Sequence, residues 1–221
     1  MKAMLLKKIG ELNRDSLQLE EIPIPSPGKG EILVKVKVCG ICHTELDEIE
    51  GRLSPPQLPV ILGHEIVGLV EKRGPAADRY QIGDRVGIAW INWACGKCSY
   101  CRDGFENLCN SAKWTGYSSN GGYAEYCVVS EDFAYNIPSF FSDLQAAPLL
   151  CAGVIGYRAL RLTGMKDGQV LGLYGFGASA HLVIQMVRYK FPGSKIFVFS
   201  RPGQFSHQEM AKKLGASWVG A

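Results

Sequence analysis

The sequence predicts a β-rich domain followed by the opening of a doubly wound α/β domain. Before residue 140, short apolar stretches alternate with polar residues and are separated by Pro and Gly clusters, which is typical of strands joined by loops. After residue 140, strand and helix patterns alternate, as in a parallel sheet with crossover helices. We therefore expect a first domain over residues 1–147 and a second over residues 148–221.

The strands of the first domain are predicted from alternation. Residues 31–39 (EILVKVKVC) alternate apolar and charged side chains, as expected of a strand with one buried face. Residues 61–72, 85–91 and 123–129 are the other candidates for extended structure. The intervening prolines and glycines predict long loops that can carry functional groups.

The second domain is predicted to contain only part of a doubly wound sheet. Its expected elements are, in order, a helical stretch over 142–162 with a break around 151–156, a strand over 169–174, a helix over 178–190, a strand over 195–200, a helix over 205–214 and the start of a strand at 217–219. A complete dinucleotide fold needs two halves of about three strands each. We therefore expect a chain that is truncated at its C-terminal side.

Composition excludes several classes of partner. The formal net charge of +3 is too small to indicate nucleic acid or a membrane surface. No stretch approaches the roughly 18 apolar residues of a membrane span, and residues 1–8 lack a signal-peptide core. We expect a cytoplasmic location, where the eight cysteines are thiols or metal ligands and not disulfides.

The spacing of four cysteines predicts a structural zinc site. Cys95, Cys98, Cys101 and Cys109 follow the pattern C-x2-C-x2-C-x7-C. Four thiolates close the tetrahedral shell of zinc and leave no position for water or substrate, so such a site orders a loop and does no chemistry. Gly96 and Gly104 supply the backbone freedom that the turns need.

Three other interpretations of this cysteine segment stay open. Reduced cysteines can fill a core, although the residues between them are mostly polar. An iron–sulfur cluster uses the same ligands. A zinc ribbon for nucleic acid is the third, and the modest net charge argues against it.

A second set of candidate ligands is dispersed along the chain. Cys42, His64 and Cys151 lie in separate segments, and Glu65 follows His64 directly. No local spacing connects them, and each taken alone is compatible with a core or a satisfied polar residue. The residues themselves therefore leave a joint metal site undecided.

A resemblance to a known family bears on this question. Residues 63–74 carry the pattern G-H-E-x2-G-x5-G, and residues 83–86 read GDRV. Together with the four-cysteine segment and a later Gly-x-Gly, in this order, they resemble the zinc signature of the medium-chain alcohol dehydrogenases. The likeness extends over residues 1–221 and is to bacterial zinc-binding members, with some likeness to cinnamyl alcohol dehydrogenases.

The resemblance implies a fold and a set of roles. The fold is an N-terminal GroES-like β-barrel catalytic domain followed by a partial Rossmann sheet. Cys42, His64 and Cys151 match the ligands of a catalytic zinc whose fourth position is open to water or substrate. Glu65 matches an acid beside that zinc and an alternative ligand. Thr44 matches the hydroxyl that hydrogen-bonds the substrate oxygen, and His43 a position near the cofactor pyrophosphate.

Two residues depart from the family pattern. Glu45 stands where members usually carry Asp, and the extra methylene requires a shifted contact to the histidine ligand. Asp47 stands where many members carry a relay histidine. We expect the proton to leave through the cofactor ribose or through water instead.

The glycine-rich turn predicts a nicotinamide cofactor. Gly175, Gly177 and Ala180 form G-x-G-x-x-A between a predicted strand and a predicted helix, which suits a pyrophosphate. Ser200 and Arg201 end the next strand, where NAD-binding proteins place an acid. A guanidinium there favours the 2′-phosphate of NADP, whereas the alternative is a solvated loop cation and NAD as cofactor.

The sequence thus predicts a zinc-dependent alcohol dehydrogenase that acts on a small primary alcohol or aldehyde. The alternative is a truncated, zinc-stabilised remnant with impaired catalysis. A homo-oligomer is compatible with the family, whose members form dimers and tetramers. Trp90, Trp93 and Trp114 suit an aromatic pocket as well as a core, so the substrate stays undefined.

Overall fold

The computed structural model describes all residues from 1 to 221 and divides into two compact units, Met1–Cys151 and Ala152–Ala221. Each unit has its own hydrophobic core. None of the helices is both long enough and apolar enough to cross a membrane.

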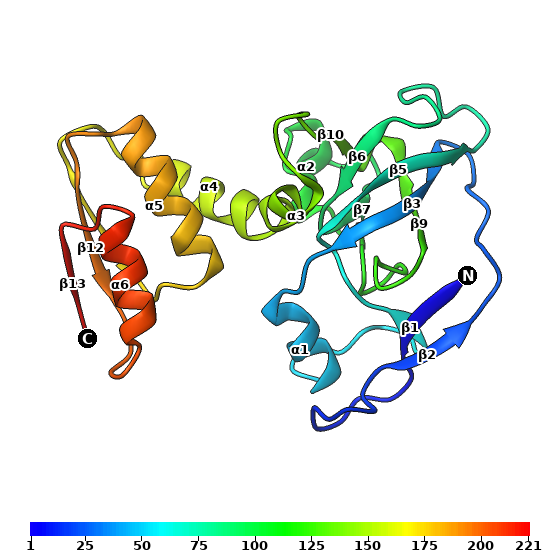
Figure 1. Ribbon diagram of the computed structural model, residues 1–221. Helices are drawn as coiled ribbons and strands as arrows, with labels where there is room; N and C mark the ends of the chain where they lie inside the picture. The colour runs from blue at the N-terminus through cyan, green and yellow to red at the C-terminus, as the bar shows by residue number, and fades with distance from the viewer. The chain divides into compact units, whose positions relative to one another are not determined.

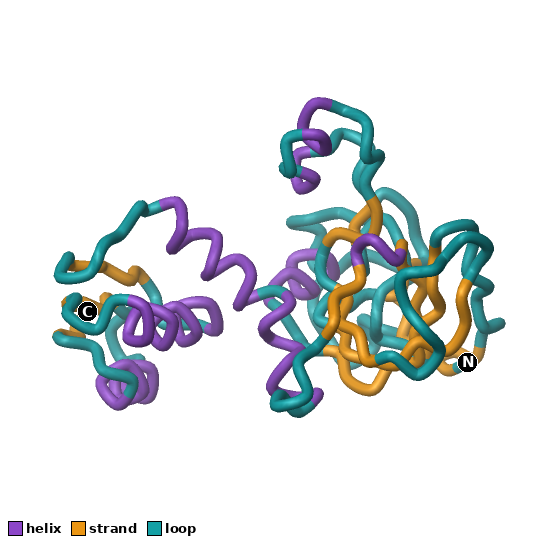
Figure 2. The backbone as a smooth tube through the Cα atoms, turned by 90° about the horizontal axis from the view of Figure 1, so that it is seen from above, coloured by secondary structure: helices purple, strands orange, loops and turns teal.

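The first unit is built around a five-stranded antiparallel sheet with the order β10-β6-β5-β3-β9. Alternate side chains of its strands, such as Ile32, Val34 and Ile66, are fully buried, and they form the main core. Figure 2 shows that strands and loops make up most of this unit. The five strands are β3 (Glu31–Cys39), β5 (Ile66–Arg73), β6 (Arg85–Ile88), β9 (Tyr126–Ser130) and β10 (Ala134–Asn136).

Two smaller sheets complete the β structure of the first unit. One is antiparallel with the order β2-β1-β4, and the other pairs β7 with β8. Their strands are β1 (Lys2–Leu6), β2 (Gln18–Glu21), β4 (Val60–Ile61), β7 (Ile91–Trp93) and β8 (Lys113–Trp114). The β7–β8 pair lies on either side of the four-cysteine segment in the sequence, so it closes the base of that loop.

The helices of the first unit are short. The longest, α1, has seven residues and begins directly after Cys42, which is its N-cap. Short helices are not stable alone in water, so packing and capping hold them in place. They are α1 (His43–Ile49), α2 (Ser99–Arg102), α3 (Asp143–Ala146) and the 3₁₀ helices η1 (Glu106–Leu108), η2 (Glu131–Phe133) and η3 (Ala147–Leu150).

The second unit is a three-stranded parallel sheet with the order β11-β12-β13. Helices α5 and α6 cover one face of it (Figure 1), and the core between them contains Ile184, Ile196 and Val198. The elements are α4 (Ala152–Leu162), β11 (Val170–Tyr174), α5 (Ala178–Lys190), β12 (Lys195–Phe199), α6 (Phe205–Lys213) and β13 (Trp218–Gly220).

The opposite face of this parallel sheet carries aromatic side chains. Tyr174 stacks on Phe199 with ring centroids 4.7 Å apart, and Phe199 lies 5.1 Å from Trp218. Tyr174 is 85% exposed and Trp218 is 45% exposed. Parallel sheets normally have both faces covered, whereas this aromatic face is an apolar surface open to solvent.

Most predicted elements are confirmed, and one expectation is wrong in detail. The strand at Glu31–Cys39 and the helix at Ala178–Lys190 have the predicted bounds. The helical break expected around 151–156 is confined to Cys151, because α4 resumes at Ala152 and includes Gly156. Gly156 is a packing residue: a Cβ atom there would lie 2.8 Å from Val183. The strand predicted at 85–91 is divided into β6, which ends at Ile88, and β7, which begins at Ile91, and strands β1, β2, β8 and β10 were not predicted from the sequence.

Candidate functional site

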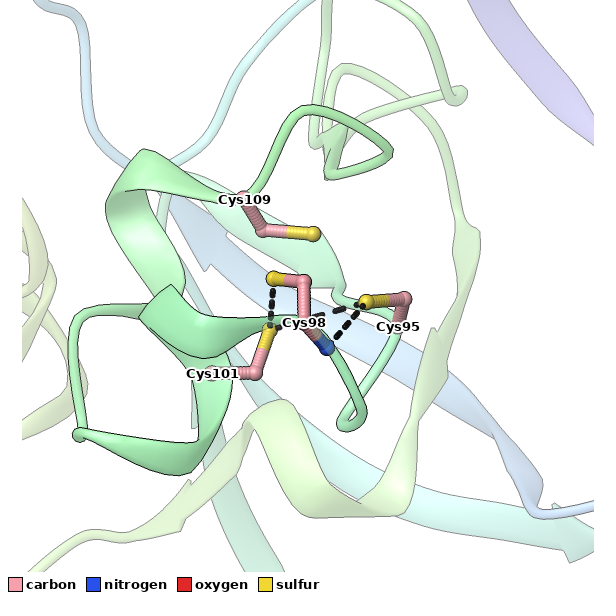
Figure 3. Close-up of side chains that lie close together, drawn as sticks. All are labelled: Cys95, Cys98, Cys101 and Cys109. Atoms are coloured by element: carbon pink, nitrogen blue, oxygen red, sulfur yellow. Dashed lines mark hydrogen bonds between the residues drawn. The ribbon is translucent and has the colours of Figure 1, made fainter.

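The four cysteines of the spaced motif converge in the structure. The thiol sulfurs of Cys95, Cys98, Cys101 and Cys109 point toward one another (Figure 3) and all lie within 4.8 Å of one another. The Sγ atoms of Cys98 and Cys101 are 3.5 Å apart, and the Cys98 backbone N–H donates to the Cys95 sulfur. This arrangement can place four thiolates around one ion.

The cysteine lobe, residues 95–109, has no apolar core of its own. Only Cys109 is buried, whereas Tyr100, Phe105 and Leu108 are exposed. Gly96 and Gly104 have positive φ values of 66° and 75°, which close the turns on both sides of α2. The interpretation of these cysteines as core residues is therefore disfavoured, because no core surrounds them.

A second group brings together the dispersed candidates. Ligand atoms of Cys42, His64, Glu65 and Cys151 all lie within 4.8 Å of one another. Cys42 caps α1, and His64 and Glu65 occupy the turn between β4 and β5. The Sγ atoms of Cys42 and Cys151 are 3.7 Å apart. The structure therefore joins residues that no spacing rule in the sequence could connect.

Packing of η3 brings Cys151 into this group. Ala146, Ala147 and Leu150 are buried against Val67 of β5 in a small core cluster. Gly87 of β6 makes room for Leu150, since a Cβ atom at Gly87 would lie 2.8 Å from it. Cys151 follows directly, so its position depends on apolar contacts that its own segment does not reveal.

Glu45 contacts two members of the group at once. One carboxylate oxygen lies 2.7 Å from His64 Nδ1, and the other accepts the Cys42 backbone N–H at 2.7 Å. Glu45 is only 2% exposed. The longer side chain thus reaches both the imidazole and the helix cap, and Nε2 remains the ring nitrogen that is free to bind a ligand.

The pKa values in this group are strongly shifted. The pKa of Cys42 is lowered to about 3, first by the hydrogen bond from Cys151 and second by the hydrogen bond from His64. The contact with Cys42 and burial have the opposite effect on Cys151 and raise its pKa. Burial alone would lower the pKa of His64, but its contacts with Cys42 and Glu45 raise it to about 10. Burial and the Cys42 charge raise the pKa of Glu65 to about 7.

The residues of this group fit a zinc ion. Thiolate sulfur and imidazole nitrogen are the donors that zinc prefers, and a carboxylate is an accepted fourth. The carboxyl groups of Glu45, Glu48 and Glu65 are 2%, 0% and 4% exposed. Three buried carboxylates this close together are unfavourable unless a cation or protons compensate their negative charge. A divalent ion can supply that compensation.

The remaining residues predicted for this site lie around Cys42. The Thr44 hydroxyl is 3.4 Å from the Cys42 sulfur, whereas the His43 side chain is 76% exposed. Asp47 accepts a 2.6 Å hydrogen bond from the Arg52 guanidinium and lies 3.9 Å from His43 Nε2. The Asp47 carboxylate is therefore engaged with the Arg52 guanidinium.

The glycine-rich turn lies at the start of α5 in the second unit. Gly175 has a φ of 87° and donates its N–H to the Phe199 carbonyl, and Gly177 is the N-cap of α5. A Cβ atom at either glycine would meet no atom within 4 Å, so the backbone there is open to a bound group. Ala180 packs partly against the core of the unit.

Ser200 and Arg201 follow β12 directly, and only the Ser200 side chain is held by a hydrogen bond to another side chain. The Ser200 hydroxyl accepts a 2.8 Å hydrogen bond from Gln208 Nε2. The Arg201 side chain is exposed, and its backbone N–H donates to Gln204. The guanidinium of Arg201 is thus available to a ligand, and Gln208 holds the neighbouring hydroxyl.

One buried acid beside the site was missed in the sequence. Glu48 is fully buried, and neither of its carboxylate oxygens has a hydrogen-bond partner. Burial and then the Glu45 charge raise the pKa of Glu48 to about 8. Its spacing of three residues from Glu45 was a signal, because that spacing puts both acids on one face of a helix, but α1 itself was not predicted.

Comparison with known families bears on the whole chain. The alcohol dehydrogenase GroES-like domain family matches residues 28–139. A probable alcohol dehydrogenase AdhA from Mycobacterium tuberculosis is 42% identical over 98% of this chain. The chain spans 63% of the length of that relative.

Solved structures show the same fold. The cobalt- and zinc-bound thermostable alcohol dehydrogenase from Pyrobaculum aerophilum has a TM-score of 0.87 and 26% identity, and the match covers 99% of this chain and 65% of that one. An alcohol dehydrogenase from E. coli in complex with NADH has the same TM-score and 28% identity, with coverage of 99% and 61%. The predicted fold class, a GroES-like β domain followed by a partial parallel sheet, is thereby confirmed.

Proposed function

Because the chain belongs to the zinc-dependent medium-chain alcohol dehydrogenase family, we propose that it serves hydride transfer between a small primary alcohol or aldehyde and NAD(P). The convergence of Cys42, His64 and Cys151 supports this proposal most directly. We also propose that residues 1–147 form the catalytic domain and that residues 148–221 belong to the cofactor-binding domain.

Cys42, His64 and Cys151 are the proposed ligands of a catalytic zinc. A zinc ion held there supplies a Lewis acid that polarises the alcohol oxygen and lowers the pKa of its proton. Glu45 orients two of these ligands through its contacts with the His64 ring and the Cys42 amide. Glu65 is the proposed alternative ligand, since its carboxylate lies within the same group.

Thr44 is the proposed first acceptor of the alcohol proton. Its hydroxyl lies beside Cys42 and can both accept and donate a hydrogen bond. Asp47 is engaged by Arg52, which supports an exit through the cofactor ribose or through water. On this proposal, Asp47→Asn leaves the pH–rate profile unchanged, and a large shift of that profile would identify Asp47 as part of the route.

The second unit is proposed to bind the nicotinamide cofactor. Gly175 and Gly177 leave open backbone at the N-terminus of the thirteen-residue helix α5, where a pyrophosphate gains N–H donors and the helix dipole. The exposed guanidinium of Arg201 supports NADP over NAD, and the exposed His43 of the first unit is a proposed cofactor-contacting residue from the family resemblance alone. Equal affinities for NADP and NAD would contradict the preference.

Metal content tests the proposed centres. Elemental analysis of the zinc-reconstituted chain is expected to give two zinc ions per chain, one in each cysteine-containing group. Cys42→Ser is expected to remove one, with loss of the thiolate absorption of the cobalt(II)-substituted site. Cys127→Ala is the matched control, since Cys127 is buried and outside both groups. One zinc in the unaltered chain would overturn the catalytic centre.

A zinc-binding chain without turnover is the second candidate function. The observation that favours it is the four-cysteine group, which can hold a zinc ion with no open position for a substrate. Cofactor titration separates the two candidates. The enzyme requires saturable NAD(P) binding and alcohol-dependent reduction of the cofactor, whereas the second candidate binds two zinc ions and neither binds nor reduces cofactor.

A further inference from the structure

The turn that carries His64 follows a very short strand. It joins β4, which has only two residues, to β5, which begins at Ile66. His64 is 1% exposed, and its Nδ1 lies 2.7 Å from the Glu45 carboxylate. Glu45 therefore sets the direction in which the imidazole points. The place of the ring depends on whatever holds the backbone that precedes it.

Residues 120–123 hold that backbone by hydrogen bonds. The Asn120 Oδ1 atom accepts the Ile61 N–H at 3.1 Å. The other three bonds join backbone groups: the N–H groups of Gly121, Gly122 and Tyr123 donate to the carbonyls of Ile61, Gly63 and Leu62 at 2.7, 2.8 and 3.0 Å, respectively. The backbone directly before His64 thus takes its position from a segment that lies far along the chain.

Two glycines allow these segments to approach closely. A Cβ atom at Gly121 would lie 2.2 Å from the Gly63 carbonyl oxygen, and one at Gly116 would lie 2.9 Å from the Gly63 nitrogen. Both distances are well short of the roughly 3.5 Å at which non-bonded heavy atoms attract most strongly. The atoms met belong to the backbone, so they cannot rotate away as the end of a side chain can. We call Gly116 and Gly121 the glycine clamp.

The two members of the clamp differ in backbone conformation. Gly116 has a φ of 82°, so any side chain there would strain the loop whatever the space around it. Gly121 has no positive φ, and its N–H already bonds to the Ile61 carbonyl. Alanine at Gly121 therefore changes the contact with the His64 turn without a conformational penalty of its own.

We propose that the glycine clamp sets the place of the His64 imidazole at the zinc centre, with Gly121 as a positioning residue. This inference rests on the proposed function. The other two proposed ligands come from separate segments, since Cys42 is the N-cap of α1 and Cys151 follows η3. They do not move with the turn. Because a zinc–nitrogen bond is about 2.0–2.1 Å long, a small displacement of the turn weakens the bond to His64.

Zinc affinity is the first measurement. Gly121→Ala is expected to lower the zinc affinity of the centre about tenfold to a hundredfold, as changes to the groups that support a ligand do. The affinity of the four-cysteine group is expected to stay unchanged, and competition with a chromogenic chelator resolves the two sites. Gly10→Ala is the matched control, because a Cβ atom at Gly10 would meet no atom within 4 Å and Gly10 has no positive φ.

The imidazole resonances separate positioning from general destabilisation. The chain has four histidines, and long-range ¹H–¹⁵N correlation spectra of the zinc-loaded chain report each ring nitrogen. At saturating zinc, the Nε2 resonance of His64 in folded Gly121→Ala is expected to move away from its wild-type, zinc-bound value. The resonances of His43, His181 and His207 are the internal reference and are expected to stay in place. A loss of stability alone leaves all four unchanged in the folded chain.

A milder variant covers the case in which Gly121→Ala does not fold. Asn120→Ala removes the side-chain acceptor of the Ile61 N–H and adds no atom to the contact. One net hydrogen bond corresponds to a factor of about two to ten. Asn120→Ala is therefore expected to lower the zinc affinity of the centre by that factor, and to move the His64 resonance in the same direction by a smaller amount.

The outcomes distinguish the clamp from the proposed function. Wild-type zinc affinity and a wild-type His64 resonance in folded Gly121→Ala overturn the clamp, and so do both wild-type values in Asn120→Ala if the alanine variant of Gly121 does not fold. Either result leaves the proposed function intact. Absence of a zinc-bound His64 resonance in the unaltered, zinc-loaded chain overturns the proposed catalytic centre and the clamp with it.

Discussion

Glu45 is the residue on which the geometry of the proposed catalytic centre depends most. Its carboxylate touches the His64 imidazole and the Cys42 backbone amide, and it is almost fully buried. Carboxylates of this kind fix the ring orientation of a histidine ligand and raise its basicity. We therefore predict that Glu45→Gln lowers zinc affinity at this centre about tenfold to a hundredfold, measured by competition with a chromogenic chelator.

Two companion variants define the cause of that loss. Glu45→Asp is expected to fall between the wild-type chain and Glu45→Gln, because the shorter side chain keeps the charge but reaches only one of the two partners. Glu50→Gln is the matched control, since Glu50 is the C-cap of the same helix and pairs with Arg52 away from the metal-ligand group. A zinc affinity of Glu45→Gln equal to that of the control would show that the bridge does not organise the centre.

Glu48 makes stability depend on pH. Its pKa is raised to about 8 in the folded chain, against 4.5 for the unfolded group, so the folded state holds the proton longer. Between these pH values the folded state binds more protons than the unfolded state, and the free energy of unfolding falls as pH rises, by at most about 1.4 kcal/mol per pH unit. Glu48→Gln is predicted to remove this component.

Urea unfolding of the metal-free chain at pH 5, 7 and 9 measures the effect, because a bound divalent cation stabilises a nearby ionised carboxyl and changes its pKa. The wild-type chain is expected to lose stability across the series more steeply than Glu48→Gln does. Glu71→Gln, which alters an exposed acid on β5, is expected to follow the wild type. Parallel curves for wild type and Glu48→Gln would refute the role of this carboxyl.

At the scale of elements, we propose that the cysteine lobe depends on a bound zinc ion. Helix α2 has four residues and η1 has three, and neither contains a buried side chain. Elements of this length do not persist alone, and on this proposal a structural zinc supplies most of their stability. We predict that Cys98→Ser loses one zinc ion and that its amides at residues 95–109 exchange with solvent at least tenfold faster than in the wild type.

Hydrogen–deuterium exchange with mass spectrometry measures the exchange rate of the amides in each peptide of the lobe. Ser99→Ala changes an exposed neighbour in the same lobe and is expected to keep both zinc ions and slow exchange. Unchanged exchange in Cys98→Ser would mean that the lobe is held by its flanking strands β7 and β8 alone.

Elements whose sequence signal lies within their own residues could be predicted from the sequence, and those that depend on other segments could not. The strand at residues 31–39 and the helix at 178–190 carry their own periodicity, so the sequence predicts their bounds. Helix α1 was missed because seven residues are too few for a periodic signal, and its N-cap is Cys42 instead of one of the residues usual at that position. The cysteine lobe was predictable for the opposite reason: its ligands lie within fifteen residues.

The dispersed site could not be predicted from the residues alone. Cys151 reaches Cys42 because Leu150 and its neighbours pack on β5, which is a contact between segments far apart in the chain. The family resemblance supplied that connection before the structure did. Glu48 lies three residues after Glu45, but this spacing points to the site only once helix α1 is known, so the folded chain was needed to find it.

At the scale of the whole molecule, separate cores predict separate unfolding. The units Met1–Cys151 and Ala152–Ala221 each bury their own apolar cluster, and both proposed zinc sites lie in the first. Ligands that bind only the native state stabilise the unit that binds them. We predict that a chelator lowers the thermal transition of the first unit and leaves that of the second in place.

Differential scanning calorimetry with and without EDTA measures both transitions, and hydrogen exchange assigns each to its unit. Zinc added back in excess is expected to restore the first transition, and magnesium at the same concentration is the control. A single transition that moves as a whole with EDTA would mean that the two units unfold as one cooperative body.

The aromatic face of the parallel sheet has a consequence for how the chain behaves in concentrated solution. Tyr174, Phe199 and Trp218 offer solvent a continuous ring surface with no charged side chain among the stacked members. Sulfate and phosphate salts strengthen contacts between such surfaces, whereas a net charge of only +3 provides weak repulsion between molecules. We therefore expect the chain to precipitate at low concentrations of sulfate, and purification requires buffers without sulfate to keep it in solution.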